Sequence, residues 1–155
     1  MEDRYLFKAK RVDNGEWVQG YLFDDGFENG RIFIGGLVIE KYNGTACDDW
    51  NVTGIDFCEV DPSTICQCTG LKDKNGNLIW ENDLVMTVYD GIEHTYVVKW
   101  DDSELGFKAT NGKKNYGNYF QYLGCCDEIE VIGNIFDNPE LLETFLTIQS
   151  YWQHL

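Results

Sequence analysis

The cysteines are the first side chains in this sequence whose chemistry could define a site. Cys66 and Cys68 are two residues apart, so in a strand they share one face, and Cys125-Cys126 lies in a turn-rich segment. Four thiolates could in principle surround zinc, but structural zinc sites use ligand pairs about two to four residues apart, often with histidine. An adjacent Cys-Cys pair fits that geometry poorly. The pattern favours buried or half-buried thiols, and we expect no metal site there.

Nucleophilic catalysis would need a low-pKa thiol beside a base, and the chain contains two histidines. His94 falls on the apolar face of its predicted strand, and His154 is the penultimate residue. The Gly-x-Gly-x-x-Gly, phosphate-loop and Gly-x-Ser-x-Gly motifs are absent from the sequence. We therefore expect no catalytic residue and no cofactor, and the sequence favours a non-enzymatic protein.

Three carboxylate pairs are the other candidate ligands: Asp24-Asp25, Asp48-Asp49 and Asp101-Asp102, the last followed by Glu104. Hard cations bind clustered oxygen ligands, but none of these pairs has the spacing of an EF-hand. Solvated acids in turns are the favoured interpretation. A metal-dependent enzyme that uses these loop carboxylates is the least favoured alternative.

An aromatic segment superficially resembles a stacking platform for single-stranded nucleic acid. Tyr116, Tyr119 and Phe120 interleave with polar residues directly after Lys113-Lys114. The charge argues against that function, because 27 Asp and Glu face 12 Lys and Arg, giving a net charge of −15. We expect no direct nucleic-acid binding, and the aromatic residues suit core packing or a protein interface.

The N-terminus lacks the apolar run of a signal peptide, and no apolar stretch is long enough to span a membrane. The acidic charge also disfavours binding to a membrane surface. These features predict a cytoplasmic protein.

The sequence predicts that short strands between tight turns position these residues. In the first half, residues 5–12 and 16–23 flank Asp13-Asn14-Gly15 as a hairpin. In the second run Trp17 and Tyr21 share one face and Val18 and Leu22 share the other, so both faces are expected to be partly covered. Residues 31–42 form a strand in which Gly35-Gly36 predicts a bulge or turn, and residues 55–60 form a short strand.

The second half continues this pattern with runs at 66–71, 78–80, 84–89, 92–100, 105–109, 119–123 and 128–136. Asn138 and Pro139 then begin a short C-terminal helix with an apolar stripe. Phe145, Ile148 and Trp152 belong to this stripe, which either docks on its own domain or forms an interface. The fold class is mainly β, at most α+β, with short antiparallel strands in one or two small barrel-like lobes.

Three stretches carry a resemblance to a known family. They are Phe7-Lys8-Ala9-Lys10 through Gly20-Tyr21, then Val60-Asp61-Pro62 through Gly76, and finally Glu130 through Leu142. The chain resembles the YopX family, small proteins encoded by phages and prophages of Gram-positive and gut bacteria. The resemblance implies a mainly β protein and carries no established activity.

The middle stretch provides the predicted structural motif, which we interpret as a hairpin followed by entry into a strand. Asp83 should accept hydrogen bonds from backbone N–H groups, as in turns that open a strand of an SH3-like barrel. Asn82 replaces a Gly usual in the family, a mild change because Asn tolerates a left-handed backbone. The motif residues are Thr69, Gly70, Leu71, Lys72, Asp73, Asn75, Gly76 and Asp83.

These observations predict an N-terminal β lobe (residues 1–62), an SH3-like β lobe (63–138) and a C-terminal helix with its tail (139–155). The favoured function is a phage or prophage accessory protein that acts as a protein-interaction module with an unknown protein partner. One alternative is an acidic nucleic-acid mimic that occupies a host DNA-binding protein, and another is a homo-oligomeric assembly component. Tyr116, Tyr119, Phe120, Phe145, Ile148 and Trp152 are the candidate interface residues.

Overall fold

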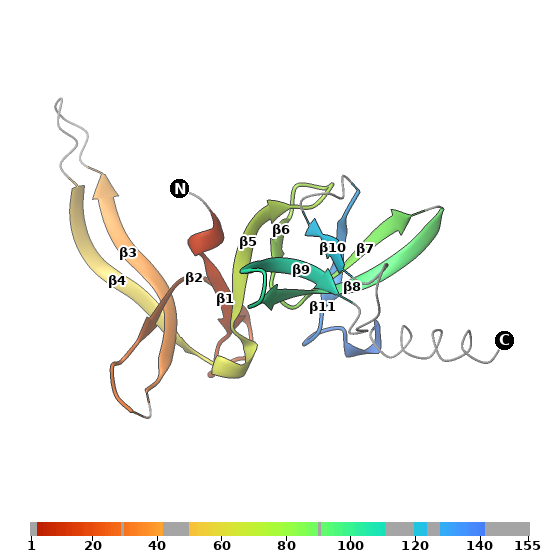
Figure 1. The fold of residues 1–155 in the computed structure, drawn as a ribbon. Coiled ribbons are helices and arrows are strands. Elements are labelled where there is room, and N and C mark those ends of the chain that lie inside the picture. Colours follow the sequence, from red (N-terminus) through yellow and green to blue (C-terminus); the bar gives the residue numbers. More distant parts are fainter. Residues whose placement is uncertain are drawn as a thin grey trace. The chain divides into compact units, whose positions relative to one another are not determined.

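The computed structural model describes residues 3–28, 30–41, 50–89, 91–110, 120–123 and 128–141, and its fold is mainly β (Figure 1). The 3-10 helices η1 (Asp3–Tyr5) and η2 (Pro62–Thr64) are short. The predicted fold class is confirmed: antiparallel strands make up most of the described chain. The barrel-like and SH3-like descriptions of its lobes stay predictions.

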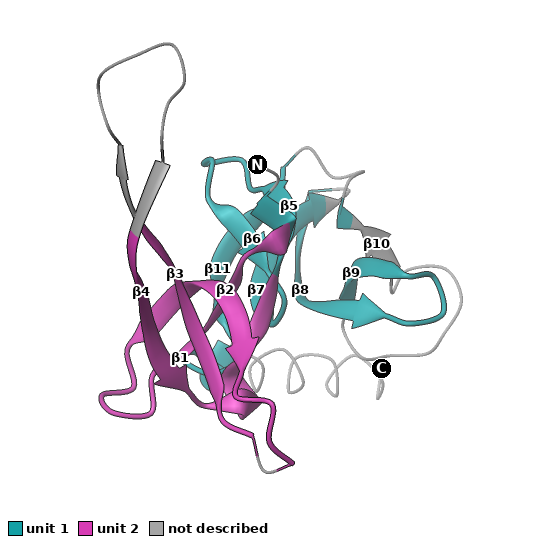
Figure 2. Cartoon of the chain, turned by 90° about the vertical axis from the view of Figure 1, so that its left-hand side faces the viewer, with its two compact units in different colours: residues 1–4, 68–155 teal, residues 5–67 magenta. Residues whose placement is uncertain are grey.

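Two compact units divide the chain (Figure 2). Unit 2 comprises Tyr5–Gln67, and unit 1 comprises Met1–Arg4 with Cys68–Leu155. Strand β5 (Cys66–Lys72) begins in unit 2 and continues in unit 1.

Unit 2 contains β1 (Phe7–Lys10), β2 (Trp17–Asp24), β3 (Ile32–Lys41) and β4 (Trp50–Val60). Its strands pair antiparallel in the order β4-β3-β2-β1, and β1 also pairs with the start of β5. The predicted first hairpin is confirmed by the register Lys10↔Trp17. Gly15 permits its tight turn because its φ is +72°, a conformation that side chains disfavour.

Two details of the second half of unit 2 differ from the sequence prediction. Strand β3 runs straight through Gly35-Gly36, and the register shift lies between Val38 and Ile39 instead. Gly35 is required by close packing: a Cβ there would lie 2.7 Å from Cα of Phe57 and closer still to the carbonyl oxygen of Asp56. Strand β4 also begins at Trp50, because β3 continues to Lys41 and pairs with it over that length.

The chain after β1 pairs with the end of β4. Arg11 forms a bridge with Val60, and the Val12 N–H donates to the Glu59 carbonyl at 3.1 Å. The core beneath is small: Ala9, Ile34 and Val60 are its fully buried members. Phe7, Val18, Ile32, Cys58 and Ile65 pack around them as half-buried side chains.

Unit 1 contains the remainder of β5, which pairs with β6 (Leu78–Trp80), and a five-stranded antiparallel sheet. The strands of that sheet are β7 (Asp83–Tyr89), β8 (Ile92–Asp101), β9 (Gly106–Thr110), β10 (Phe120–Tyr122) and β11 (Glu130–Asn134). They lie side by side in the order β10-β9-β8-β7-β11. The two hairpins predicted around the turns at Gly76 and Gly91 are confirmed by the β5–β6 and β7–β8 pairings. Its core is the larger cluster Ile79, Val85, Tyr96, Val98, Ala109, Leu123 and Ile129.

The C-terminal helix begins at Pro139, as predicted, and its described part ends at residue 141. The Leu141 N–H donates to the Asn138 carbonyl at 3.2 Å. No helix among the described residues has the length and apolar run needed to cross a bilayer.

Candidate interaction surface

The outer face of β2, β3 and β4 carries an unusual share of apolar surface. Cross-strand pairing fixes which side chains share it, because Phe23 lies opposite Phe33 and Leu37 lies opposite Ile55. Leu37, Ile55 and Phe57 are 57%, 59% and 57% exposed. We define the outer face as Tyr21, Phe23, Phe33, Leu37, Ile55 and Phe57.

Phe57 is held in place within this face although it is exposed. It pairs with Gly35, which leaves room above the β3 backbone, and its ring meets that of Phe33 edge-to-face at a centroid distance of 5.4 Å. The guanidinium of Arg31 lies 5.7 Å from the Phe33 ring. An aromatic ring that is fixed before binding costs little entropy when a partner covers it.

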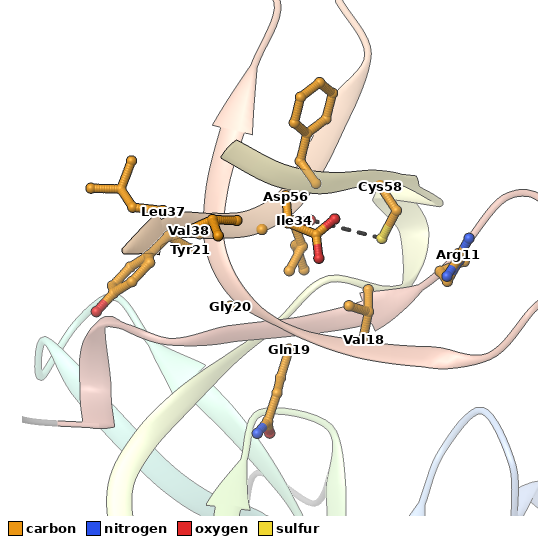
Figure 3. Close-up of a pocket in the computed structure, with 13 residues that line it drawn as sticks. Arg11, Val18, Gln19, Gly20, Tyr21, Ile34, Leu37, Val38, Asp56 and Cys58 are labelled. Carbon is orange, nitrogen blue, oxygen red and sulfur yellow. Dashed lines mark hydrogen bonds between the residues drawn. The ribbon is translucent and has the colours of Figure 1, made fainter. Parts of the chain in front are cut away.

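The opposite face of the same strands encloses an open pocket of about 490 Å³ (Figure 3). Val18, Ile34, Asp56 and Cys58 line it, and Gln19 points away from it in Figure 3. Ile34 is fully buried, so it forms a closed apolar floor. The volume lies within the range of ligand pockets and also suits one or two side chains of a protein partner.

The polar groups of the pocket are few. Arg11 donates from Nε to Oδ1 of Asp13 at 2.8 Å, and this bond raises the pKa of Arg11 and lowers that of Asp13. Asp56 lines the pocket, is exposed, and has no hydrogen-bond or ion-pair partner within the described residues. Burial raises the pKa of the Cys58 thiol, whose Sγ donates to the Ile34 carbonyl at 3.7 Å. The pocket therefore presents the carboxylate of Asp56 and a half-buried thiol whose protonated form is favoured by burial.

The predicted structural motif lies in unit 1 and consists of tightly bonded turns. Thr69 donates through Oγ1 to the Ile79 carbonyl at 2.8 Å, and Gly70 and Gly76 have φ values of +80° and +85°. Leu71 and Lys72 end β5, where Lys72 pairs with Leu78. Asp83 accepts from the Trp80 N–H at 2.8 Å, the type of contact that the sequence predicts.

Asp73 is the central polar residue of this motif. Its carboxylate accepts from the N–H groups of Asn75 and Asn77 at 2.9 and 2.8 Å and from that of Val131 at 3.2 Å. Burial alone would raise the pKa of Asp73, but these hydrogen bonds outweigh it and the pKa is lowered. Because its acceptor sites are used by the fold, Asp73 holds the turn and β11 together.

The candidate ligands from the sequence do not converge on a metal site in the described part of the chain. Cys66 and Cys68 are buried, and their thiols face the carbonyls of Thr64 and Ile79. The carboxylates of Asp101 and Glu104 contact Nζ of the buried Lys108 at 2.9 and 2.6 Å. Asp24 and Asp25 accept from backbone N–H groups of their own turn. Cys47, Asp48, Asp49, Cys125 and Cys126 lie outside the described residues.

The predicted interface residues also lie largely beyond what the structure describes. Tyr116, Tyr119, Phe145, Ile148 and Trp152 are outside the described residues, and Phe120 is described only in its backbone, in β10. Sequence reasoning missed the outer face and the pocket. The alternation in β2 was a usable signal: we expected both of its faces to be partly covered, and Tyr21 and Phe23 are partly covered, with 36% and 44% of their surface exposed.

Comparison with known proteins agrees with this fold. No curated protein matches the chain. Among solved structures it is similar to the crystal structure of protein EF1440 from Enterococcus faecalis, with a TM-score of 0.50 and 22% sequence identity. That match covers 88% of this chain and 96% of the other, and at this identity it supports the fold alone.

Comparison with protein families assigns the chain to a family. The family described as YopX protein matches residues 7–143, which include most of both units and the whole structural motif. The chain therefore belongs to the YopX protein family.

Proposed function

We propose that this protein is a non-enzymatic protein-interaction module, a phage or prophage accessory factor that acts in the bacterial cytoplasm through unit 2. The observation that carries the proposal is the outer face: three of its side chains, Leu37, Ile55 and Phe57, are each more than half exposed on neighbouring strands. Exposed apolar side chains are common singly, but a contiguous group on one sheet face is typical of a binding surface.

The composition of the face supports a protein partner. Aromatic side chains dominate it, and aromatic residues are enriched at the energetic centres of protein interfaces. Charged side chains lie at the edge of the outer face. There Nε of Arg31 is 3.6 Å from Oδ2 of Asp25, and Nη1 of Arg31 is 3.9 Å from Oε2 of Glu59. An apolar centre with a charged rim is the ordinary anatomy of such an interface.

The test is an affinity pull-down from a lysate of the bacterium that encodes the chain, with proteins identified by mass spectrometry. The key variant carries Leu37→Ser, Ile55→Ser and Phe57→Ser. A matched control carries Val88→Ser, Ile92→Ser and Leu105→Ser, which are similarly exposed in unit 1. We expect a partner that the wild type and the control retain and that the outer-face variant loses.

Salt separates the competing explanations of such a partner. Binding through apolar contacts should survive high salt, whereas an acidic nucleic-acid mimic would lose its partner as salt rises. A partner that only the control variant loses, or no partner at either salt concentration, would contradict the proposal.

A further inference from the structure

We infer that the open edge of β4 is a docking strand that binds an extended segment of the partner by β-strand addition, and that this segment alternates apolar and basic residues. The inference rests on the proposed function and specifies how the interaction is made. It uses the β4 edge at Ile55–Phe57, the outer face and the pocket.

At Ile55 and Phe57, no other described strand pairs with the backbone of β4 on the side away from β3. The Glu59 carbonyl accepts from Val12 on that side, so the main-chain groups of Phe57 and Ile55, two and four residues earlier, point the same way. The described residues provide no hydrogen-bond partner for these groups there. An unpaired strand edge is a template for pairing with another chain.

The side chains of this edge define the apolar positions of the added segment. Ile55 and Phe57 project on the outer face, and Leu37 lies directly opposite Ile55. Because side chains of neighbouring strands lie side by side on one face, the residues beside Ile55 and Phe57 should be apolar. Phe57 is already fixed against Phe33, so it offers a formed contact surface.

In the added segment, the residue between these two apolar positions must face the pocket. Its side chain should be one that can bind the Asp56 carboxylate. Asp56 has no partner among the described residues, and Arg11, which also lines the pocket, forms an ion pair with Asp13. A Lys or Arg side chain can lay its apolar stem along the pocket wall and bring its charged end to Asp56. The expected recognition pattern is therefore apolar–basic–apolar.

A second copy of the chain is the main competing occupant, and charge disfavours it. The whole chain has a net charge of −15, and unit 2 contains eleven Asp and Glu against five Lys and Arg. Antiparallel pairing of two β4 strands centred on residues 55–57 would also bring the two Asp56 carboxylates together. The same negative charges attract a basic partner segment and strengthen its binding.

The first experiment selects displayed random nine-residue peptides on the full-length chain. We expect enrichment of apolar–basic–apolar sequences on the wild type and of apolar–acidic–apolar sequences on Asp56→Lys. Ile55→Pro removes an edge N–H and should abolish the enrichment, whereas Ile55→Ala keeps that N–H and should weaken binding only a few-fold. Circular dichroism checks that each variant is folded.

A second measurement does not depend on any variant folding. The best selected peptide is synthesised with a single N-methyl group at each position in turn, and its affinity is measured by fluorescence anisotropy. Strand addition predicts losses of about tenfold or more at alternate positions, where the N–H pairs with β4, and small changes at the positions between them.

The remaining outcomes overturn the inference in distinguishable ways. Enriched peptides without the alternating pattern, or without an alternating N-methyl effect, would contradict strand addition while leaving an interaction module. Failure to enrich any peptide, together with no partner in the pull-down, would contradict both. A dimer in sedimentation that Ile55→Pro dissociates would assign the edge to a second copy.

Discussion

The two units of this chain use their apolar residues differently. Of the buried hydrophobic side chains in the described residues, ten lie in unit 1 and four in unit 2. Unit 2 nevertheless contains Leu37, Ile55 and Phe57, which are exposed on one face. Unit 1 uses its apolar side chains mainly to stabilise itself, whereas unit 2 leaves several available for a partner.

The polar groups show the same contrast. In unit 1, Asp73 and Lys108 are buried, and each is held by several bonds that the fold requires. In unit 2, Asp56 is exposed and has no partner among the described residues. Satisfied buried groups indicate a structural role, whereas an unpaired carboxylate beside an apolar pocket is suited to recognition.

The largest effect that we expect is the disruption of unit 2 by one methyl group. Gly35→Ala would place Cβ within 2.7 Å of Phe57 Cα, so β3 and β4 must separate, at a cost of about 3 kcal/mol or more. Gly36→Ala is the matched control, because a Cβ there meets nothing within 4 Å. Urea unfolding measures both variants, and similar losses in the two would refute the close-packing argument.

The second effect concerns the core of unit 1. Leu84 is fully buried, so Leu84→Ala should reduce the free energy of unfolding by about 3 kcal/mol. Val88→Ala lies on the same strand at 45% exposure and should change it by less than about 1 kcal/mol. Thermal unfolding distinguishes the two, and a small effect of Leu84→Ala would contradict the view that unit 1 is the better packed unit.

The third effect is a pH dependence located in the turn of unit 1. The hydrogen bonds to Asp73 hold its folded-state pKa below the ordinary value of 3.8, so its contribution to stability is present above about pH 4 and is lost as the pH falls through the folded-state pKa. Asp73→Asn should therefore cost about 1–2 kcal/mol at neutral pH and progressively less in acid.

Urea unfolding between pH 7 and pH 2 tests this dependence. Asp56→Asn is the control, because this exposed carboxylate accepts no hydrogen bond from the described residues, so its replacement removes no bond of the fold. A constant difference between Asp73→Asn and the wild type across the pH range would contradict the expected linkage.

The smallest effect on stability should accompany the largest effect on binding. Replacing Leu37, Ile55 and Phe57 together by Ser should change the free energy of unfolding by only about 1–2 kcal/mol, because each side chain is more than half exposed. The same variant should lose the partner in the pull-down. If it unfolds instead, the outer face belongs to the fold and the contrast between the units fails.

The sequence by itself determined the strands, the tight turns and the family. These are local properties: Gly15 permits its turn through its own φ, and alternation along β2 assigns Trp17 and Val18 to opposite faces whatever lies nearby. The buried state of Cys66 and Cys68 was also predictable, because the sequence offered no suitable ligand spacing.

Only the tertiary structure decided which faces are covered. Alternation sorts side chains into two faces, but how far each face is covered depends on elements far away in the sequence, so no local pattern predicted that Leu37, Ile55 and Phe57 are each more than half exposed. The role of Gly35 likewise depends on Phe57, a strand away, and within the described part of the chain Val12 pairs with the end of β4 alone, which leaves the rest of that edge open. Long-range pairing, which no local pattern encodes, created the surface on which the proposed function rests.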